Sequence, residues 1–96
     1  SEDFFNKAPN EVYQSVFELV SIYPNPVVTN ELRLTIDSDW DIAQYEIIDI
    51  NGRLMNVGQV ERFNPTITMN SITNGLYVLM VKVAGQEQAI KFTIKR

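Results

Sequence analysis

The sequence predicts an all-β domain, and three features support this. From Val16 onward, β-branched and aromatic residues alternate with polar ones, and no segment has a clear helical period. Turn-forming residues recur roughly every eight to twelve positions. Evenly spaced short strands of this kind are typical of a β-sandwich or a β-barrel. The 96 residues suffice for one compact domain and not for two.

We expect seven antiparallel strands. They cover residues 16–23 (VFELVSIY), 31–36 (ELRLTI), 43–50 (AQYEIIDI), 53–60 (RLMNVGQV), 65–69 (PTITM), 76–84 (LYVLMVKVA) and 86–95 (QEQAIKFTIK). Alternation is clearest in the second, where Leu32, Leu34 and Ile36 share one face. In the last two strands the inward rows are Tyr77, Leu79, Val81 and Val83, and Ile90, Phe92 and Ile94. Val78 and Met80 lie on the opposite face, which favours a central position for residues 76–84.

The turns between these strands have recognisable chemistry. Asn51-Gly52 and Asn74-Gly75 tolerate positive φ, and Gly85-Gln86 stands where a tight hairpin requires it. Residues 1–15 have no clean period and contain a proline, so we expect a linker or the tail of a preceding region, with the domain at residues 16–96. Phe4 and Phe5 suggest that this lead-in docks on the domain or on another chain.

Composition excludes several functions. The chain has no cysteine and no histidine, which removes thiol nucleophiles, disulfides, the usual general base and the usual zinc ligand. We therefore expect no enzymatic activity and no cofactor. Residues 1–50 carry ten acids and two bases, whereas residues 51–96 carry two acids and six bases. The overall charge of −4 argues against binding to nucleic acid.

Two prolines, Pro24 and Pro26, end the first expected strand. Each lacks a backbone N–H, fixes φ and pushes the preceding residue out of the helical region. The chain must therefore leave the sheet near Tyr23, and the Asn25 side chain can hydrogen-bond nearby backbone. Such a corner is common at strand ends, and it is also a stiff surface feature that a partner could bind at low entropic cost.

Several motifs together resemble a known family. They are YPNP at residues 23–26, IIDINGRLM at 47–55, NGLYVLMV at 74–81, a glycine turn at Gly85 and KFTIKR at 91–96. In order and spacing, these motifs resemble the C-terminal sorting domain of proteins exported by the type IX secretion system, also called the Por secretion system. The resemblance extends from about Phe17 to Arg96.

The resemblance implies an Ig-like seven-stranded antiparallel β-sandwich at the C-terminus of a larger exported protein. It implies passage through the periplasm and outer membrane to the cell surface or the extracellular space. The outer-membrane translocon would recognise the domain, and a sortase-like cysteine protease would then remove it and could anchor the cargo. The residues that match the family motif, and that would bind these partners, are Pro24, Asn25, Pro26, Asp49, Gly52, Arg53, Gly75, Tyr77, Lys95 and Arg96.

The same residues also have plain structural interpretations. Gly52 and Gly75 suit turns whatever the domain does, and Tyr77 fits a core aromatic whose hydroxyl reaches the backbone. Lys95 and Arg96 have no expected role in a core, which favours them as contacts for an external protein. The last strand has only Lys91 to protect its edge between Ala89 and Ile94, so a homodimer through edge strands, or through the N-terminal segment, is a further expectation.

Two other functions fit parts of the sequence. Trp40 and Tyr45 would form a sugar-stacking platform of a carbohydrate-binding or adhesion module if both were exposed, although Trp40 is expected to cap the sandwich instead. Asp37, Asp39 and Asp41 resemble a calcium loop, but Ile42 stands where an EF-hand needs glycine, which favours an acidic solvated loop. A structural spacer in a surface protein is a third alternative.

Overall fold

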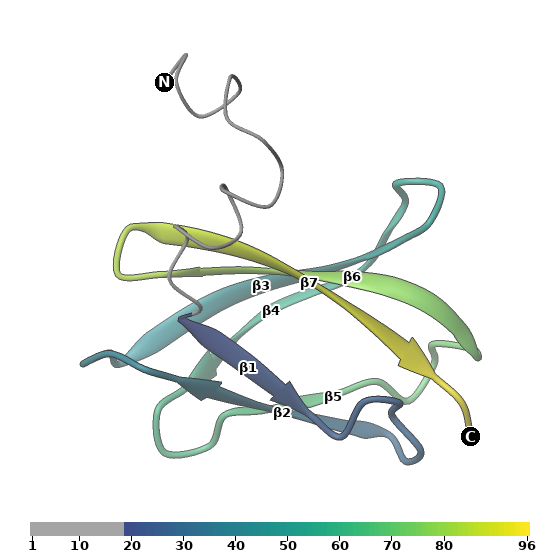
Figure 1. Ribbon diagram of the computed structural model, residues 1–96, viewed down its shortest axis with the longest axis horizontal. Coiled ribbons are helices and arrows are strands. Elements are labelled where there is room, and N and C mark those ends of the chain that lie inside the picture. Colours follow the sequence, from purple (N-terminus) through teal and green to yellow (C-terminus); the bar gives the residue numbers. More distant parts are fainter. Residues whose placement is uncertain (1–18) are drawn as a thin grey trace, which may run out of the picture.

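The computed structural model describes residues 19–96, which form seven β-strands (Figure 1). The strands are β1 (Val20–Tyr23), β2 (Glu31–Ile36), β3 (Ile42–Asp49), β4 (Leu54–Glu61), β5 (Thr66–Thr68), β6 (Gly75–Val83) and β7 (Gln86–Ile94). Each corresponds to one expected strand, and most bounds agree within a residue or two. The expected linker at residues 1–15, with Phe4 and Phe5, lies outside the described residues.

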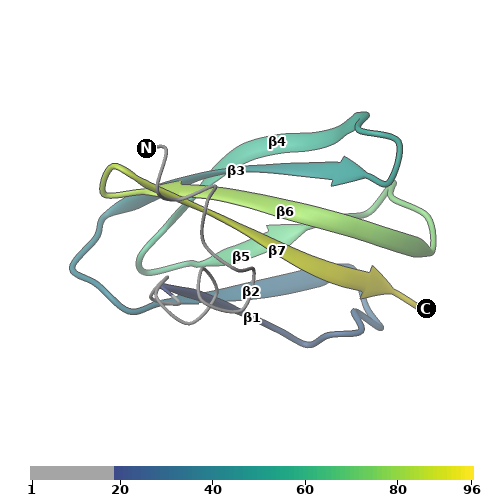
Figure 2. The ribbon, with the colours of Figure 1, turned by 45° about the horizontal axis from the view of Figure 1, so that its top comes forward.

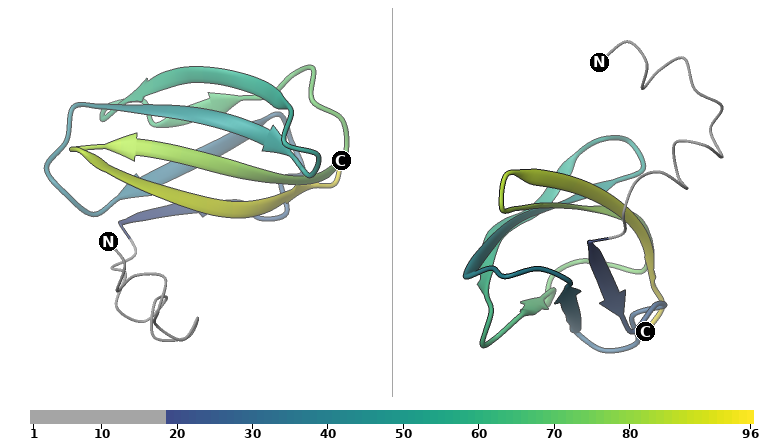
Figure 3. Two further views of the ribbon diagram at one scale, coloured as in Figure 1. Left: turned by 90° about the horizontal axis from the view of Figure 1, so that it is seen from above. Right: turned by 60° about the vertical axis from the view of Figure 1, so that its left-hand side comes forward.

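The strands form two antiparallel sheets that face each other (Figures 1 and 2). One sheet has three strands in the order β1-β2-β5, and the other has four in the order β4-β3-β6-β7. Seen from above, the four-stranded sheet lies over the three-stranded one (Figure 3). Because the two sheets are separate and form two layers, the fold is a β-sandwich and not a β-barrel. No helix able to cross a membrane occurs among residues 19–96.

The hydrophobic core lies between the sheets because the strands alternate as the sequence predicts. Leu32, Leu34 and Ile36 of β2 are buried, and the residues between them are exposed. The inward row of β6 is also buried from Tyr77 to Val83, and Phe92 and Ile94 of β7 face it. Burying each large apolar side chain contributes roughly 1.5–3 kcal/mol. The expected inner rows are therefore confirmed, as is the central position of β6 between β3 and β7.

The turn between β6 and β7 consists of Ala84 and Gly85, and both residues have positive φ. Their φ angles are 52° and 77°, as a two-residue type I′ hairpin requires. The expected tight hairpin at Gly85 is thus confirmed. Ala84 is an unusual residue there, because its Cβ makes the left-handed conformation unfavourable.

The outer edge of β7 is partly covered by the segment that follows the prolines. The Val27 N–H donates to the Thr93 carbonyl at 2.7 Å, and the Lys95 N–H donates to the Val27 carbonyl at 2.8 Å. Val27 and Ile94 form a parallel bridge, and Val27 is fully buried. The expectation of an exposed edge in the last strand is therefore wrong for its final residues, because a segment 66 residues or more away in sequence occupies it.

Replacing Ala84 provides a test of the hairpin. Ala84→Asn creates the Asn-Gly pair that type I′ turns favour and should raise the free energy of unfolding by roughly 0.5–1 kcal/mol. Ala84→Val should lower it, since a β-branched residue is disfavoured at positive φ. Urea denaturation of both variants measures the difference. Equal stability of the two variants would contradict the turn geometry.

Candidate functional site

The residues that match the family motif lie at one end of the sandwich, although they come from four separate parts of the chain. Asp49 at the end of β3 pairs with Tyr77 near the start of β6, and Gly75 pairs with Ile94 at the end of β7. Val27, directly after the proline corner, bridges to the same Ile94. The ends of β1, β3 and β7 and the start of β6 therefore converge on the side where the C-terminus lies (Figure 1).

The proline corner is exposed, and Asn25 attaches it to β7. Pro24, Asn25 and Pro26 are all on the surface, and both Tyr23-Pro24 and Asn25-Pro26 are cis peptide bonds. The Asn25 Oδ1 accepts a hydrogen bond from the Thr93 N–H at 3.1 Å, and the Asn25 Nδ2 donates to the Lys91 carbonyl at 3.5 Å. The side chain thus takes the place of a strand partner. The expectation that Asn25 bonds backbone is confirmed, but that backbone is distant in sequence.

Arg96 clamps the same end, contrary to the expectation that it has no structural role. Its Nε donates to the Thr29 carbonyl at 2.9 Å, and its two terminal nitrogens donate to the carbonyls of Ile72 and Met69, each at 2.6 Å. Only the planar guanidinium can bond three carbonyls in this fork geometry. Arg96 therefore ties the segment after β7 to the loops that precede β2 and β6.

Asn74 also contributes to this clamp, through side-chain hydrogen bonds to the Arg96 backbone. Its Oδ1 accepts a hydrogen bond from the Arg96 N–H at 3.1 Å, and its Nδ2 donates to the Arg96 carbonyl at 3.4 Å. The sequence identified Asn74 only as a turn residue. Its partner could not be inferred, because the two residues are 22 positions apart. Lys95, in contrast, is exposed, and its side chain forms none of the hydrogen bonds or ion pairs found among residues 19–96.

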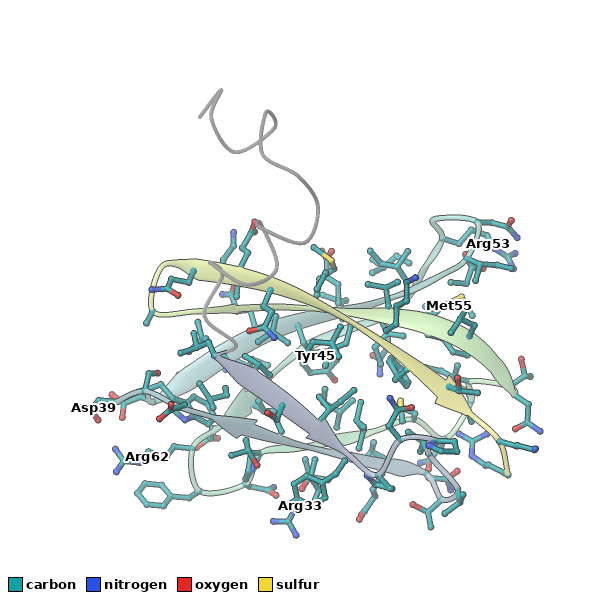
Figure 4. The ribbon with its side chains drawn as sticks, in the orientation of Figure 1. Arg33, Asp39, Tyr45, Arg53, Met55 and Arg62 are labelled. Carbon is teal, nitrogen blue, oxygen red and sulfur yellow. The ribbon has the colours of Figure 1, made fainter. Side chains whose placement is uncertain are left out.

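The turn between β3 and β4 is organised by the Asp49 carboxylate. Its Oδ1 accepts from the N–H groups of Asn51 and Arg53, each at 2.9 Å, and its Oδ2 accepts from the Arg53 Nε at 2.8 Å. Gly52 has a φ of 85°, which explains the glycine at this turn. The Arg53 backbone N–H, helped by the Arg53 side chain and the Asn51 N–H, lowers the pKa of Asp49 below its ordinary 3.8. Figure 4 shows Arg53 at the tip of this turn.

Tyr77 has the structural role that the sequence favours. It is 5% exposed, and its hydroxyl donates to the Thr73 carbonyl at 2.7 Å. Its ring packs against Phe92, with the ring centroids 5.9 Å apart. Gly75 lies close to it, since a Cβ added at Gly75 would be 3.5 Å from the Tyr77 ring. Tyr77 thus fixes the loop before β6 to the core.

Gln88 is a further structural residue that the sequence reading missed. Its side chain accepts hydrogen bonds from the N–H groups of Leu19 and Val20 and donates to the Val20 carbonyl. It joins β1 to β7 across the two sheets. A signal was present in the sequence, because Gln88 continues the inward row of Ile90, Phe92 and Ile94. A polar residue at an inward position indicates a hydrogen-bonded bridge.

The structure argues against the sugar platform and the calcium loop. Trp40 is 9% exposed and belongs to the core, as its expected capping role requires, and Tyr45 is half-buried against the same core. Burial raises the pKa of the Tyr45 phenol. Asp39 forms an ion pair with Arg62 at 3.2 Å (Figure 4), and within residues 19–96 no three acidic side chains converge on one point.

A family model describes most of this chain. The model of the secretion system C-terminal sorting domain matches residues 21–95. The chain therefore belongs to this family, the C-terminal sorting domains of type IX secretion. Comparison with curated proteins gives no match. Membership makes the domain a sorting signal that the type IX machinery recognises, and it implies export across the outer membrane to the cell surface or the extracellular space.

The Arg96 clamp can be tested with a matched pair of variants. Arg96→Ala removes three hydrogen bonds from a charged donor and should lower the free energy of unfolding by roughly 1–3 kcal/mol. Lys95→Ala leaves its backbone hydrogen bond to Val27 in place and should change stability by less than about 0.5 kcal/mol. Thermal and urea unfolding of both variants distinguish the two roles. A stable Arg96→Ala protein would show that the clamp contributes little.

The Asp49 turn predicts a specific pH dependence. Because the folded-state pKa of Asp49 is lowered from its ordinary 3.8, its carboxylate stabilises the fold fully at pH values above that ordinary pKa. That contribution disappears as the pH falls through the folded-state pKa. Asp49→Asn should therefore be less stable than the parent protein at neutral pH, and the gap should narrow in acid. A gap that is constant between pH 7 and pH 2, measured by urea denaturation, would refute this.

Proposed function

We propose that the domain acts as a rigid export handle whose recognition surface is the end of the sandwich described above. The main support is that the motif residues, scattered along the chain, converge on this end, in a domain of a sorting family. The outer-membrane translocon would bind this end first. A sortase-like cysteine protease would then remove the domain and could attach the cargo to the cell surface.

The contacts of the motif residues suggest a division of roles within this surface. Asn25, Asp49, Tyr77 and Arg96 direct their polar groups to the backbone, so we assign them to shaping the surface. Gly52 and Gly75 permit the turns that these side chains hold. Pro24, Pro26 and Lys95 are exposed, and the Arg53 side chain is 74% exposed. We assign these four residues to direct contact with the machinery.

The fold supports an Ig-like sandwich as the scaffold for this handle. Sheets of the strands β1-β2-β5 and β4-β3-β6-β7 match an Ig-like order in which the fourth strand pairs with the second sheet instead of the first. The Tyr77 hydroxyl, which returns to the backbone of Thr73 just before β6, resembles the tyrosine corner of such domains. A preorganised surface of this kind binds its receptor with little loss of conformational entropy.

Export of a reporter tests the proposed contacts. The chain would be fused behind a reporter carrying a periplasmic export signal, in a bacterium that has a type IX system. We expect Lys95→Ala to reduce the reporter outside the cell several-fold although it leaves the domain stable, because it removes a contact and no structural bond. The reporter is measured by immunoblot of the medium, the cell surface and the periplasm.

Gln86→Ala serves as the control, since Gln86 is exposed at the opposite end of β7. It should be exported like the parent fusion. Recognition would lie elsewhere on the domain if the Lys95→Ala fusion were exported as well as the parent fusion. The same would follow if Gln86→Ala reduced export as much as Lys95→Ala. Retention of the parent fusion in the periplasm would reject the proposed handle function for this chain.

A further inference from the structure

The outward face of the four-stranded sheet, which points away from the core, carries an apolar row (Figure 3, left). Leu54 on β4 pairs with Ile48 on β3, and Ile48 pairs in turn with Val78 on β6. None of the three belongs to the core, and Leu54 is 55% exposed. Leu76, on the same face of β6, is 47% exposed. The solvated face of an antiparallel sheet is usually polar, so an apolar row indicates a face that is covered.

The next row along the same face borders a hollow. Val57 pairs with Glu46, and Glu46 pairs with Met80. These three residues line a hollow of about 320 Å³, together with Gln44 and Lys82 of the following row. Pockets that hold small molecules have volumes of roughly 300–1,000 Å³, so this hollow has room for an aromatic side chain.

A positive charge ends the apolar row at β7. Lys91 pairs with Val78 and is exposed. Its side chain forms none of the ion pairs found among residues 19–96. The row therefore matches an occupant that has apolar or aromatic side chains next to carboxylates.

Residues 1–18 of the same chain have this composition. Glu2 and Asp3 stand directly before Phe4 and Phe5. The 18 residues contain four acidic residues and one basic residue, so their net charge is opposite in sign to that of Lys91. Adjacent phenylalanines are rarely left in water.

The point of attachment brings this segment within reach of the face. The Leu19 N–H donates to the Gln88 side chain at 3.0 Å, and Gln88 belongs to β7, an edge strand of the same sheet. Phe5 is 14 positions before Leu19, a length that spans up to about 50 Å when extended and roughly 20 Å as a flexible chain. From β7 to β4 the sheet is only about 14 Å wide.

We propose that residues 2–5 dock on the outward face of the four-stranded sheet of their own chain. Phe4 and Phe5 cover the apolar row and the hollow beside it, and the two carboxylates that precede them lie beside Lys91. Ordering a chain segment costs conformational entropy, so the docked state is best detected by covalent trapping. This proposal is independent of the export function.

A pair of introduced cysteines tests the docking, because the chain has no cysteine of its own. Asn6→Cys is combined with Val57→Cys, at a position 59% exposed on the proposed face. The matched control combines Asn6→Cys with Thr35→Cys, exposed on the other sheet. Thr35 pairs with Ser21, near Leu19, so a free tether would favour the control. In dilute protein, the Val57 pair should close its intramolecular disulfide roughly tenfold faster, because docking raises the effective thiol concentration.

Changes to the aromatic pair show whether it carries the docking. Phe4→Ser with Phe5→Ser should make the two rates equal, whereas Phe4→Leu with Phe5→Leu should keep most of the difference. Circular dichroism confirms that each variant is folded. Equal rates for the Val57 and Thr35 pairs in the parent background would overturn the proposal. Disulfide-linked dimers whose rate of formation rises with protein concentration would also overturn it, since they would assign the face to a second copy.

A charge exchange tests the placement of the carboxylates. Lys91→Glu should slow closure of the Val57 pair, because it sets like charges together. Adding Glu2→Lys and Asp3→Lys should restore the rate, because the opposite charges are then exchanged. If the rate were unaffected by Lys91→Glu, the carboxylates would not lie beside Lys91.

Discussion

The attachment of β7 is the constraint on which the rest of this structure depends. β7 provides Phe92 and Ile94 to the core, yet it is the last strand and lies at the edge of its sheet. Among residues 19–96, only β6 pairs with it as a strand. Its other side is held by Val27, by the Asn25 side chain and by the Gln88 bridge to β1. Loss of these bonds would expose the inner row of β7 and open the sandwich along one side.

This attachment also determines where the proposed recognition surface can form. The bonds that hold the end of β7 come from the proline corner, the loop before β2 and the loop before β6. Each of these segments is therefore fixed at the same end of the molecule. A surface made of loops is usually mobile, but here the Arg96 guanidinium bonds the backbone of two loops. The Asn25 and Asn74 side chains in turn bond the backbone of β7 and of Arg96. The proposed recognition surface thus depends on residues that also stabilise the fold, among them Arg96.

Among residues 19–96, no strand pairs with the outer side of β4, whereas Asn25 and Val27 cover the final residues of the β7 edge in the same sheet. A domain carried on an exported protein has to remain soluble, and an unprotected edge works against that unless a partner covers it. The Asp49 turn lies immediately before β4, so its geometry sets where the edge begins. Any partner that contacts Arg53 would therefore lie beside the start of β4.

The sequence by itself determined the seven strands, their inward rows, the three glycine turns and the family motif. Alternation and turn chemistry are local properties, which is why Leu32, Leu34 and Ile36 could be placed inside, and why Tyr77 was expected to reach the backbone. It did not determine the partners of Asn25, Asn74 and Arg96. Their hydrogen bonds join residues 22 to 68 positions apart. Only the packing of the two sheets brings these segments together, because a side chain's distant backbone partners have no signature in local sequence. The sequence alone indicates that Arg96 is a free basic residue. Only the tertiary structure decided that its side chain is a clamp between two loops.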